Sequence, residues 1–83
     1  MATISGTVTL DQAPASRVYV RLYGPSGEFV SEEYTREDGR FQFHVATGTW
    51  TLEARAAGAE TEKRAVDVKD ADASADIALR RSN

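Results

Sequence analysis

Few side chains in this 83-residue sequence could carry out catalysis. His44 is the only histidine, so a Ser-His-Asp triad or a histidine metal site would depend on it. His44 lies between Phe43 and Val45 in an alternating segment, which puts its ring on the outer face of a strand. The sequence has no cysteine, which excludes thiolate nucleophiles, disulfides and cysteine-ligated metals. We therefore predict a non-enzymatic protein with no catalytic residue, no metal ligand and no cofactor.

Acidic residues offer a weak alternative to this interpretation. Asp70, Asp72 and Asp76 lie close together, and calcium often uses aspartates at alternate positions. The segment lacks the glycine and the distal glutamate of a known calcium loop, so a solvated loop is favoured and calcium stays the alternative. Glu32 and Glu33 are adjacent on a predicted strand and point to opposite faces, which excludes a cooperating carboxylate pair.

The residue types best suited to binding lie at Tyr19, Arg21 and Tyr23. If Val18, Val20 and Leu22 face the core, the three binding candidates form a row on the outside of the same strand. Tyrosine and arginine combine large contact area with hydrogen bonding and are enriched at binding hot spots. The row therefore predicts a binding face for a protein partner, or for a carbohydrate that stacks on the rings. Cross-strand packing that only stabilises the sheet would use the same residues.

Alternation with a period of two runs along most of the chain and positions this row. It predicts an all-β, seven-stranded Greek-key sandwich in a single domain over residues 1–83. The expected strands are residues 3–10, 17–23, 28–35, 40–45, 49–56, 60–68 and 77–80. The expected centre of the core is Trp50, Phe41, Phe43, Val20 and Leu22.

Particular residues refine this expectation. Phe29 or Val30 should face inward from the third strand, and Asp38-Gly39 should close a tight hairpin. Gly6 lies in the middle of a strand, which indicates a bulge or a close backbone approach. Residues 60–68 form a polar strand expected at a sheet edge.

Composition and charge restrict the possible partners. Hydrophobic residues make up 41% and charged residues 28% of the chain, an ordinary globular balance. The net charge of −3 is spread along the chain, so no basic surface for nucleic acid is expected. No apolar run approaches the ~20 residues of a membrane span, and no signal peptide is recognisable. We expect a cytoplasmic protein that contacts neither nucleic acid nor membrane.

Four segments together resemble a known group of domains. They are Ser5-Gly6-Thr7-Val8, Val18-Tyr19-Val20-Arg21-Leu22, Glu37-Asp38-Gly39-Arg40-Phe41 and Gly48-Thr49-Trp50-Thr51-Leu52. This layout resembles the carboxypeptidase regulatory-like domains, which have a prealbumin-like (transthyretin-like) sandwich. A second set of segments is Val20-Arg21-Leu22, Gly27-Glu28-Phe29, Gly39-Arg40-Phe41-Gln42-Phe43 and Gly48-Thr49-Trp50-Thr51-Leu52. Within that group, this set resembles a family of small actinobacterial proteins of unknown function that are often encoded beside a thiosulfate sulfurtransferase.

The resemblance implies an accessory role, with a sulfurtransferase as the suggested partner and a link to sulfur metabolism. Those relatives begin with an extension carrying a cysteine that this sequence lacks, so a sulfur-carrying role is not expected. Prealbumin-like 5-hydroxyisourate hydrolases rely on several residues, including a C-terminal Tyr-Arg-Gly-Ser. This chain ends Arg80-Arg81-Ser82-Asn83, so that activity is not expected. The predicted function is a protein-interaction or accessory module, with a carbohydrate-binding module as the alternative.

Overall fold

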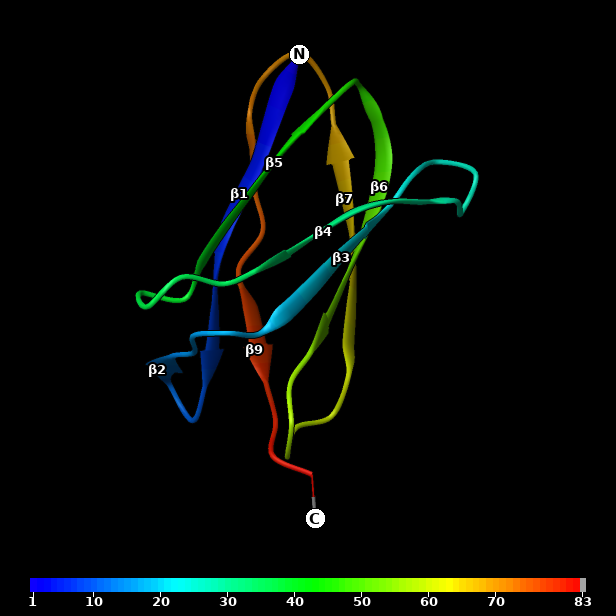
Figure 1. The fold of residues 1–83 in the computed structure, drawn as a ribbon. Helices are drawn as coiled ribbons and strands as arrows, with labels where there is room; N and C mark the ends of the chain where they lie inside the picture. Colours follow the sequence, from blue (N-terminus) through cyan, green and yellow to red (C-terminus); the bar gives the residue numbers. More distant parts are fainter. Residues whose placement is uncertain (83) are drawn as a thin grey trace.

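The computed structural model describes residues 1–82, in which every regular element is a β-strand. These residues form nine strands, whose arrangement can be followed in Figure 1. They are β1 (Ala2–Leu10), β2 (Ala13–Pro14), β3 (Tyr19–Tyr23), β4 (Phe29–Tyr34), β5 (Arg40–Val45), β6 (Gly48–Arg55), β7 (Glu62–Val68), β8 (Ala73–Ser74) and β9 (Ile77–Leu79). No helix in this part of the chain is long and apolar enough to cross a membrane.

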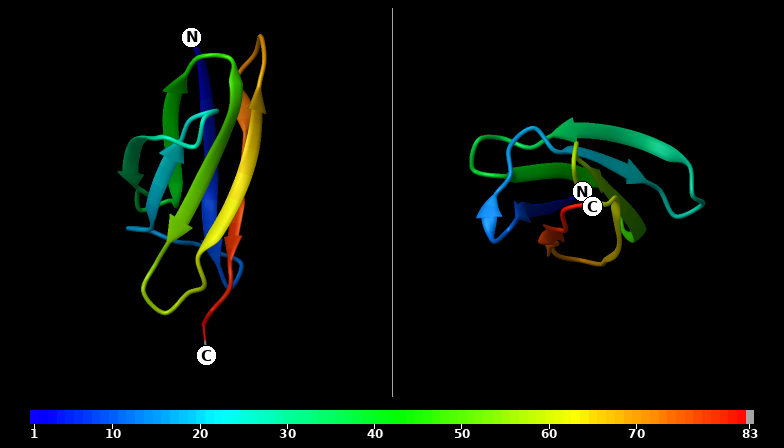
Figure 2. Two further views of the ribbon diagram at one scale, coloured as in Figure 1. Left: turned by 90° about the vertical axis from the view of Figure 1, so that its right-hand side faces the viewer. Right: turned by 90° about the horizontal axis from the view of Figure 1, so that it is seen from below.

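The strands form two sheets that face each other, as the end-on view of Figure 2 shows. One sheet has the strand order β4-β3-β6-β7 with antiparallel pairing throughout. In the other sheet, β1 is central and pairs antiparallel with β5 and β2. β8 and β9 also pair with β1, in the parallel direction. The fold is therefore an all-β sandwich, as the alternating pattern predicts.

Two strands in this count were not expected from the sequence. β2 and β8 contain two residues each and lie between the strands predicted from the sequence. Both are pairings with β1 rather than independent strands, because Leu10 pairs with Ala13 and Ile4 pairs with Ala73. Nine strands therefore replace the predicted seven.

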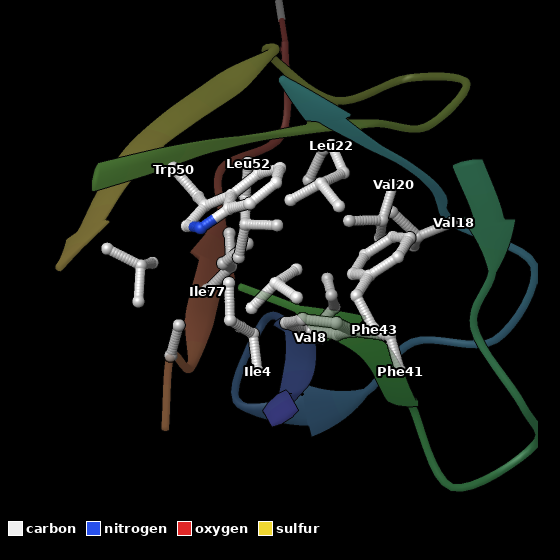
Figure 3. Close-up of a cluster of buried hydrophobic side chains, with 14 of the residues drawn as sticks. Ile4, Val8, Val18, Val20, Leu22, Phe41, Phe43, Trp50, Leu52 and Ile77 are labelled. Carbon is white, nitrogen blue, oxygen red and sulfur yellow. The ribbon is translucent and has the colours of Figure 1, made fainter. Parts of the chain in front are cut away.

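The hydrophobic core lies between the sheets and contains the residues expected there. Trp50, Phe41, Phe43, Val20 and Leu22 are all buried, and Figure 3 shows side chains from the two sheets meeting at this centre. The indole N–H of Trp50 donates a hydrogen bond to the carbonyl of Ala46 at 2.9 Å. This bond satisfies the one polar atom of the indole, so the large ring is buried without an unpaired donor.

The prediction for the third strand was wrong. Phe29 and Val30 do not face the core, and 52% and 46% of their surfaces are exposed. β4 is one of the two edge strands of the four-stranded sheet, and only Ser31 among its six residues is even half-buried. Alternation produces a buried face only where another layer covers the strand. Here the opposite sheet does not cover β4.

The turn at Asp38-Gly39 is tight, but it does not connect paired strands. Gly39 has a φ of +79° and donates a backbone hydrogen bond to Arg36 at 2.9 Å, which closes the turn. β4 then pairs with β3 while β5 pairs with β1. The predicted hairpin is therefore a crossing from one sheet to the other.

Gly6 marks a close backbone approach, as expected. A Cβ atom at this position would overlap the carbonyl oxygen of Ala75 and lie 2.6 Å from its carbonyl carbon. Ala75 also donates its N–H to the carbonyl of Ser5 at 2.9 Å. The glycine therefore allows the segment between β8 and β9 to lie directly against β1.

Polar contacts close the two open sides of the sandwich. On one side, the Thr35 hydroxyl accepts a hydrogen bond from Val18 N–H at 2.9 Å and donates one to Ala15 C=O at 2.7 Å. On the other side, Arg64 of β7 donates to the backbone carbonyl of Asp76. These contacts hold the outer strands against a core that is thin in a chain of this size.

Candidate functional site

Tyr19, Arg21 and Tyr23 lie on the outer face of β3, in the middle of the four-stranded sheet. Each is half-buried, while Val20 and Leu22 between them are fully buried. The sequence pattern therefore placed the row on the correct face. Its role in binding stays a prediction.

Two aromatic side chains from β4 extend the row, and the sequence pattern missed both. Tyr34 pairs with Tyr19 across the strands, with ring centroids 5.2 Å apart, and Phe29 pairs with Tyr23, with centroids 6.1 Å apart. The exposed fraction is 66% for Tyr34 and 52% for Phe29. We call the five side chains Tyr19, Arg21, Tyr23, Phe29 and Tyr34 the outer aromatic patch.

A register shift explains why Phe29 was placed wrongly. The pairing of β3 with β4 shifts between Leu22 and Tyr23, so that Ser31 lies opposite Leu22 and Phe29 lies opposite Tyr23. This irregularity turns Phe29 to the outer face. Glu32 and Tyr34 are two positions apart in β4, so their side chains lie on the same face of the strand. This spacing was the signal that could have placed Tyr34 beside Tyr19.

Arg21 is the central side chain of the outer aromatic patch. Its guanidinium carbon lies 5.1 Å from the ring centroid of Tyr19 and 5.5 Å from that of Phe29, within the range of cation–π contacts. Its Nη1 donates to the Tyr23 hydroxyl at 3.4 Å. Hydrogen bonds to Tyr23 and Tyr19 raise the pKa of Arg21, so its charge is permanent. The positive charge is therefore held in place by two aromatic rings and one tyrosine hydroxyl.

Carboxylates flank Arg21 on both neighbouring strands. The Cα partners of Arg21 are Glu32 on β4 and Glu53 on β6, and Lys63 on β7 continues this line across the sheet. Glu32 raises the pKa of Tyr19. Alternating charges across one row stabilise the sheet and orient its polar groups.

Glu53 is the buried acid of this face, with only 5% of its surface exposed. It accepts a hydrogen bond from the Tyr23 hydroxyl at 3.3 Å and lies 3.4 Å from Arg55 Nε and 3.9 Å from Lys63 Nζ. These partners compensate the cost of burying the carboxylate. Glu53 therefore lies beside the patch, holds the Tyr23 hydroxyl by a hydrogen bond, and is too buried to contact a ligand.

Two of the three aspartates considered for calcium, Asp72 and Asp76, have backbone partners. Asp72 accepts a hydrogen bond from Thr3 N–H at 2.9 Å, and Asp76 accepts one from Thr7 N–H at 3.0 Å. Both carboxylates therefore accept hydrogen bonds from N–H groups of β1 that the short strands β8 and β9 leave unpaired. Among residues 1–82, no group of three or more His, Asp or Glu side chains is arranged to hold a metal ion.

The remaining candidates lie apart from the outer aromatic patch. His44 is exposed on β5 in the opposite sheet, and its Nδ1 lies 3.4 Å from the Thr3 hydroxyl. A hollow of about 410 Å³ lies near the start of β1, lined by residues that include Met1, Thr47 and Asp70. Neither place combines a nucleophile, a base and an orienting group.

Comparison with known proteins identifies the family. The family described as a protein of unknown function, DUF1416, matches residues 1–79. This chain belongs to the DUF1416 family. No curated protein matches the sequence significantly.

Solved structures share the fold of this DUF1416 protein. A 5-hydroxyisourate hydrolase of Klebsiella pneumoniae superimposes with a TM-score of 0.80 at 18% identity, over 100% of this chain and 93% of that one. The pilus 2b backbone protein of group B streptococcus gives 0.84 at 13% identity, over 96% of this chain and 41% of that one. A type II cohesin–X–dockerin complex of Acetivibrio cellulolyticus gives 0.73 at 23% identity, covering 98% and 58% respectively. These likenesses show a prealbumin-like sandwich and, at such identities, the fold alone.

Proposed function

We propose that this DUF1416 protein is a non-enzymatic protein-interaction or accessory module whose binding face is the outer aromatic patch. The observation that carries the proposal is the exposure of Phe29 and Tyr34 above an ordered support of Tyr19, Arg21 and Tyr23. Aromatic side chains whose conformations are fixed before binding lose little entropy on association. They also provide the contact area that dominates binding energy at protein interfaces.

A protein partner fits this patch better than a carbohydrate does. The rings of Tyr19 and Tyr34 are inclined to each other by 43°, and those of Tyr23 and Phe29 by 72°. Such neighbouring rings do not form one flat platform for a sugar chain. Inclined rings with an arginine between them instead suit a partner with an uneven surface.

A thiosulfate sulfurtransferase is the first partner to test. The sequence resemblance to actinobacterial proteins encoded beside such enzymes supports this choice. The proposal includes a cytoplasmic location and a link to sulfur metabolism. An accessory subunit needs an exposed recognition face and no catalytic group of its own. The outer aromatic patch meets that requirement.

The test is capture of partners from a native lysate followed by titration of the purified partner with this protein. The double variant Phe29→Ser/Tyr34→Ser removes the exposed rings and leaves Tyr19, Arg21 and Tyr23 in place. We expect it to weaken binding at least about tenfold, as the loss of two aromatic contacts would. The triple variant Tyr19→Ala/Arg21→Ala/Tyr23→Ala, shown to be folded by circular dichroism, should also lose the partner.

The matched control is Gln42→Ala/His44→Ala on the exposed face of the opposite sheet. This variant should bind the purified partner as tightly as the unchanged protein. Equal affinity of the Phe29→Ser/Tyr34→Ser variant would exclude the outer aromatic patch as the binding face. Binding of glycans without any protein partner would favour the carbohydrate alternative.

A further inference from the structure

The two sheets have four lateral edges, and three of them are blocked against another strand. β5 is blocked by carboxylates, because Arg40 N–H donates to Asp38 at 3.1 Å and Gln42 N–H donates to Glu33 at 3.4 Å. The side formed by β8 and β9 consists of strands of two and three residues. Very short strands and occupied backbone donors both prevent edge-to-edge pairing.

β7 is blocked in a different way. Its first four residues, Glu62 to Ala65, are exposed and include Glu62, Lys63 and Arg64. Charged side chains, lysine above all, protect an edge. Arg64 is moreover directed across the open side of the sandwich to the carbonyl of Asp76.

β4 is the edge that remains accessible. It has six residues, and five of them are exposed. The N–H and carbonyl of Thr35 form hydrogen bonds with Val18 and Arg17, on the β3 side of the strand. Backbone groups of successive residues in a strand point to opposite sides, so those of Glu32 and Tyr34 point away from β3. No side chain among residues 1–82 forms a hydrogen bond with the backbone of β4. The edge therefore offers the donors and acceptors of a strand that could be extended.

The charges of β4 select the partner. Glu32 and Glu33 are adjacent in the strand, and both are exposed. Two copies of β4 paired antiparallel along their full length would place Glu32 of each copy diagonally across from Glu33 of the other on the same face, which is unfavourable for like charges. A strand with lysine or arginine opposite Glu32 would form a favourable cross-strand pair, and an aromatic or β-branched residue would pack on Tyr34.

We propose that β4 binds an extended basic segment of a partner protein, which adds to the four-stranded sheet as a fifth strand. This inference rests on the proposed function and names the partner's chemistry. The backbone hydrogen bonds of β4 provide the attachment, and Glu32 together with the exposed rings of Phe29 and Tyr34 provides the selection. The outer aromatic patch and the edge of β4 then form one continuous interface.

The test uses synthetic peptides and amide NMR of the whole protein. The probe is a capped peptide in which lysine alternates with valine and threonine. Its two controls carry glutamate in place of lysine, or N-methyl groups on the backbone amides that would pair. We expect the basic peptide to slow hydrogen exchange at the Glu32 and Tyr34 amides at least about tenfold at saturation, and neither control to do so.

Charge reversal sharpens the result. Glu32→Lys should lose the basic peptide and gain the glutamate peptide, while Glu62→Lys on β7 should behave like the unchanged protein. The proposal is overturned if the basic peptide does not bind at millimolar concentration, or if the protected amides lie in β5 or β7. It is also overturned if the protein alone forms a dimer that already protects Tyr34.

The native partner distinguishes this inference from the proposed function. If Phe29→Ser/Tyr34→Ser loses the partner but the complex leaves the Glu32 and Tyr34 amides unprotected, the patch binds without strand addition. The proposed function then stands and strand addition fails. If that variant keeps the partner, the proposed function itself fails.

Discussion

Arg21 is the one positively charged side chain of the outer aromatic patch, and its contacts fix its position. The rings of Tyr19 and Phe29 lie on its guanidinium, and the Tyr23 hydroxyl accepts from Nη1. Its Nε is buried with no hydrogen-bond partner among residues 1–82. An arginine ordered in this way has already lost most of its rotamer freedom, so binding through it costs little further entropy.

The neighbouring Tyr19 gives a measurable sign of this arrangement. Glu32 raises the pKa of Tyr19 above its ordinary value of 10.0, because the carboxylate favours the neutral phenol. A pKa raised in the folded state contributes stability that is fully present below pH 10 and is lost as the pH rises through the folded pKa. Glu32→Ala should therefore lower the pKa of Tyr19.

Phenolate absorbance followed against pH measures this change, and Tyr19→Phe identifies which transition belongs to Tyr19. Glu33→Ala is the matched control, because it removes a carboxylate from the adjacent residue on the other face of β4. An unchanged Tyr19 titration in Glu32→Ala would show that the carboxylate has no influence on the ring.

Among the elements, those covered by an opposing layer were predictable from the sequence. Val20 and Leu22 in β3, and Phe41 and Phe43 in β5, alternate with exposed or half-buried residues as the pattern requires. β4 was not predictable in this way. Whether a strand is covered depends on the width of the opposite sheet, and no local pattern contains that information.

The Asp-rich segment shows a second limit of prediction. The acids of residues 70–76 were visible in the sequence, and their solvated-loop interpretation was reasonable from composition. All three aspartates are exposed, but the carboxylates of Asp72 and Asp76 also accept hydrogen bonds from the backbone of β1, 69 positions earlier in the chain. A role that depends on so distant a partner is set by topology.

Gly6 provides a test of how the elements fit together. Gly6→Ala would force a methyl group against the backbone of Ala75, which cannot move without displacing β8 and β9. We expect a loss of about 3 kcal/mol in the free energy of unfolding, at the upper end for overpacking. Urea denaturation measures it.

The control for this substitution is Gly27→Asn. Gly27 has a φ of +81° and open space around its Cβ position. Asparagine tolerates this conformation, so the loss should be no more than about 1 kcal/mol. Equal losses in the two variants would contradict the close approach at Gly6.

On the scale of the whole molecule, the two sheets share one core and are expected to unfold together. Leu52 is fully buried and pairs with Leu22 in the middle of the four-stranded sheet. Leu52→Ala should lower the free energy of unfolding by about 2–5 kcal/mol, because removal of the buried side-chain atoms leaves a cavity in the core. A chain of this size has little stability to spare, so the denaturation midpoint should fall strongly.

Two signals measured in the same urea titration check that expectation. The fluorescence of Trp50 reports on the space between the sheets, and far-ultraviolet circular dichroism reports on all strands. The two midpoints should coincide in the unchanged protein and in Leu52→Ala. Val30→Ala, at an exposed position of β4, should change the midpoint little. Separate transitions would show that the sheets are independent.

The position of β1 has a consequence for biosynthesis. Of the strands in this sandwich, β1 is synthesised before all others, whereas β8 and β9, which pair with one side of it, are synthesised after all others. Until those residues emerge, one edge of the central strand is unpaired and the Ile4 and Val8 side of the core lacks Ile77. Contacts between such distant segments also form slowly. The sandwich is therefore completed only after β9 has emerged, and until then β1 keeps an unpaired edge that other strands could bind.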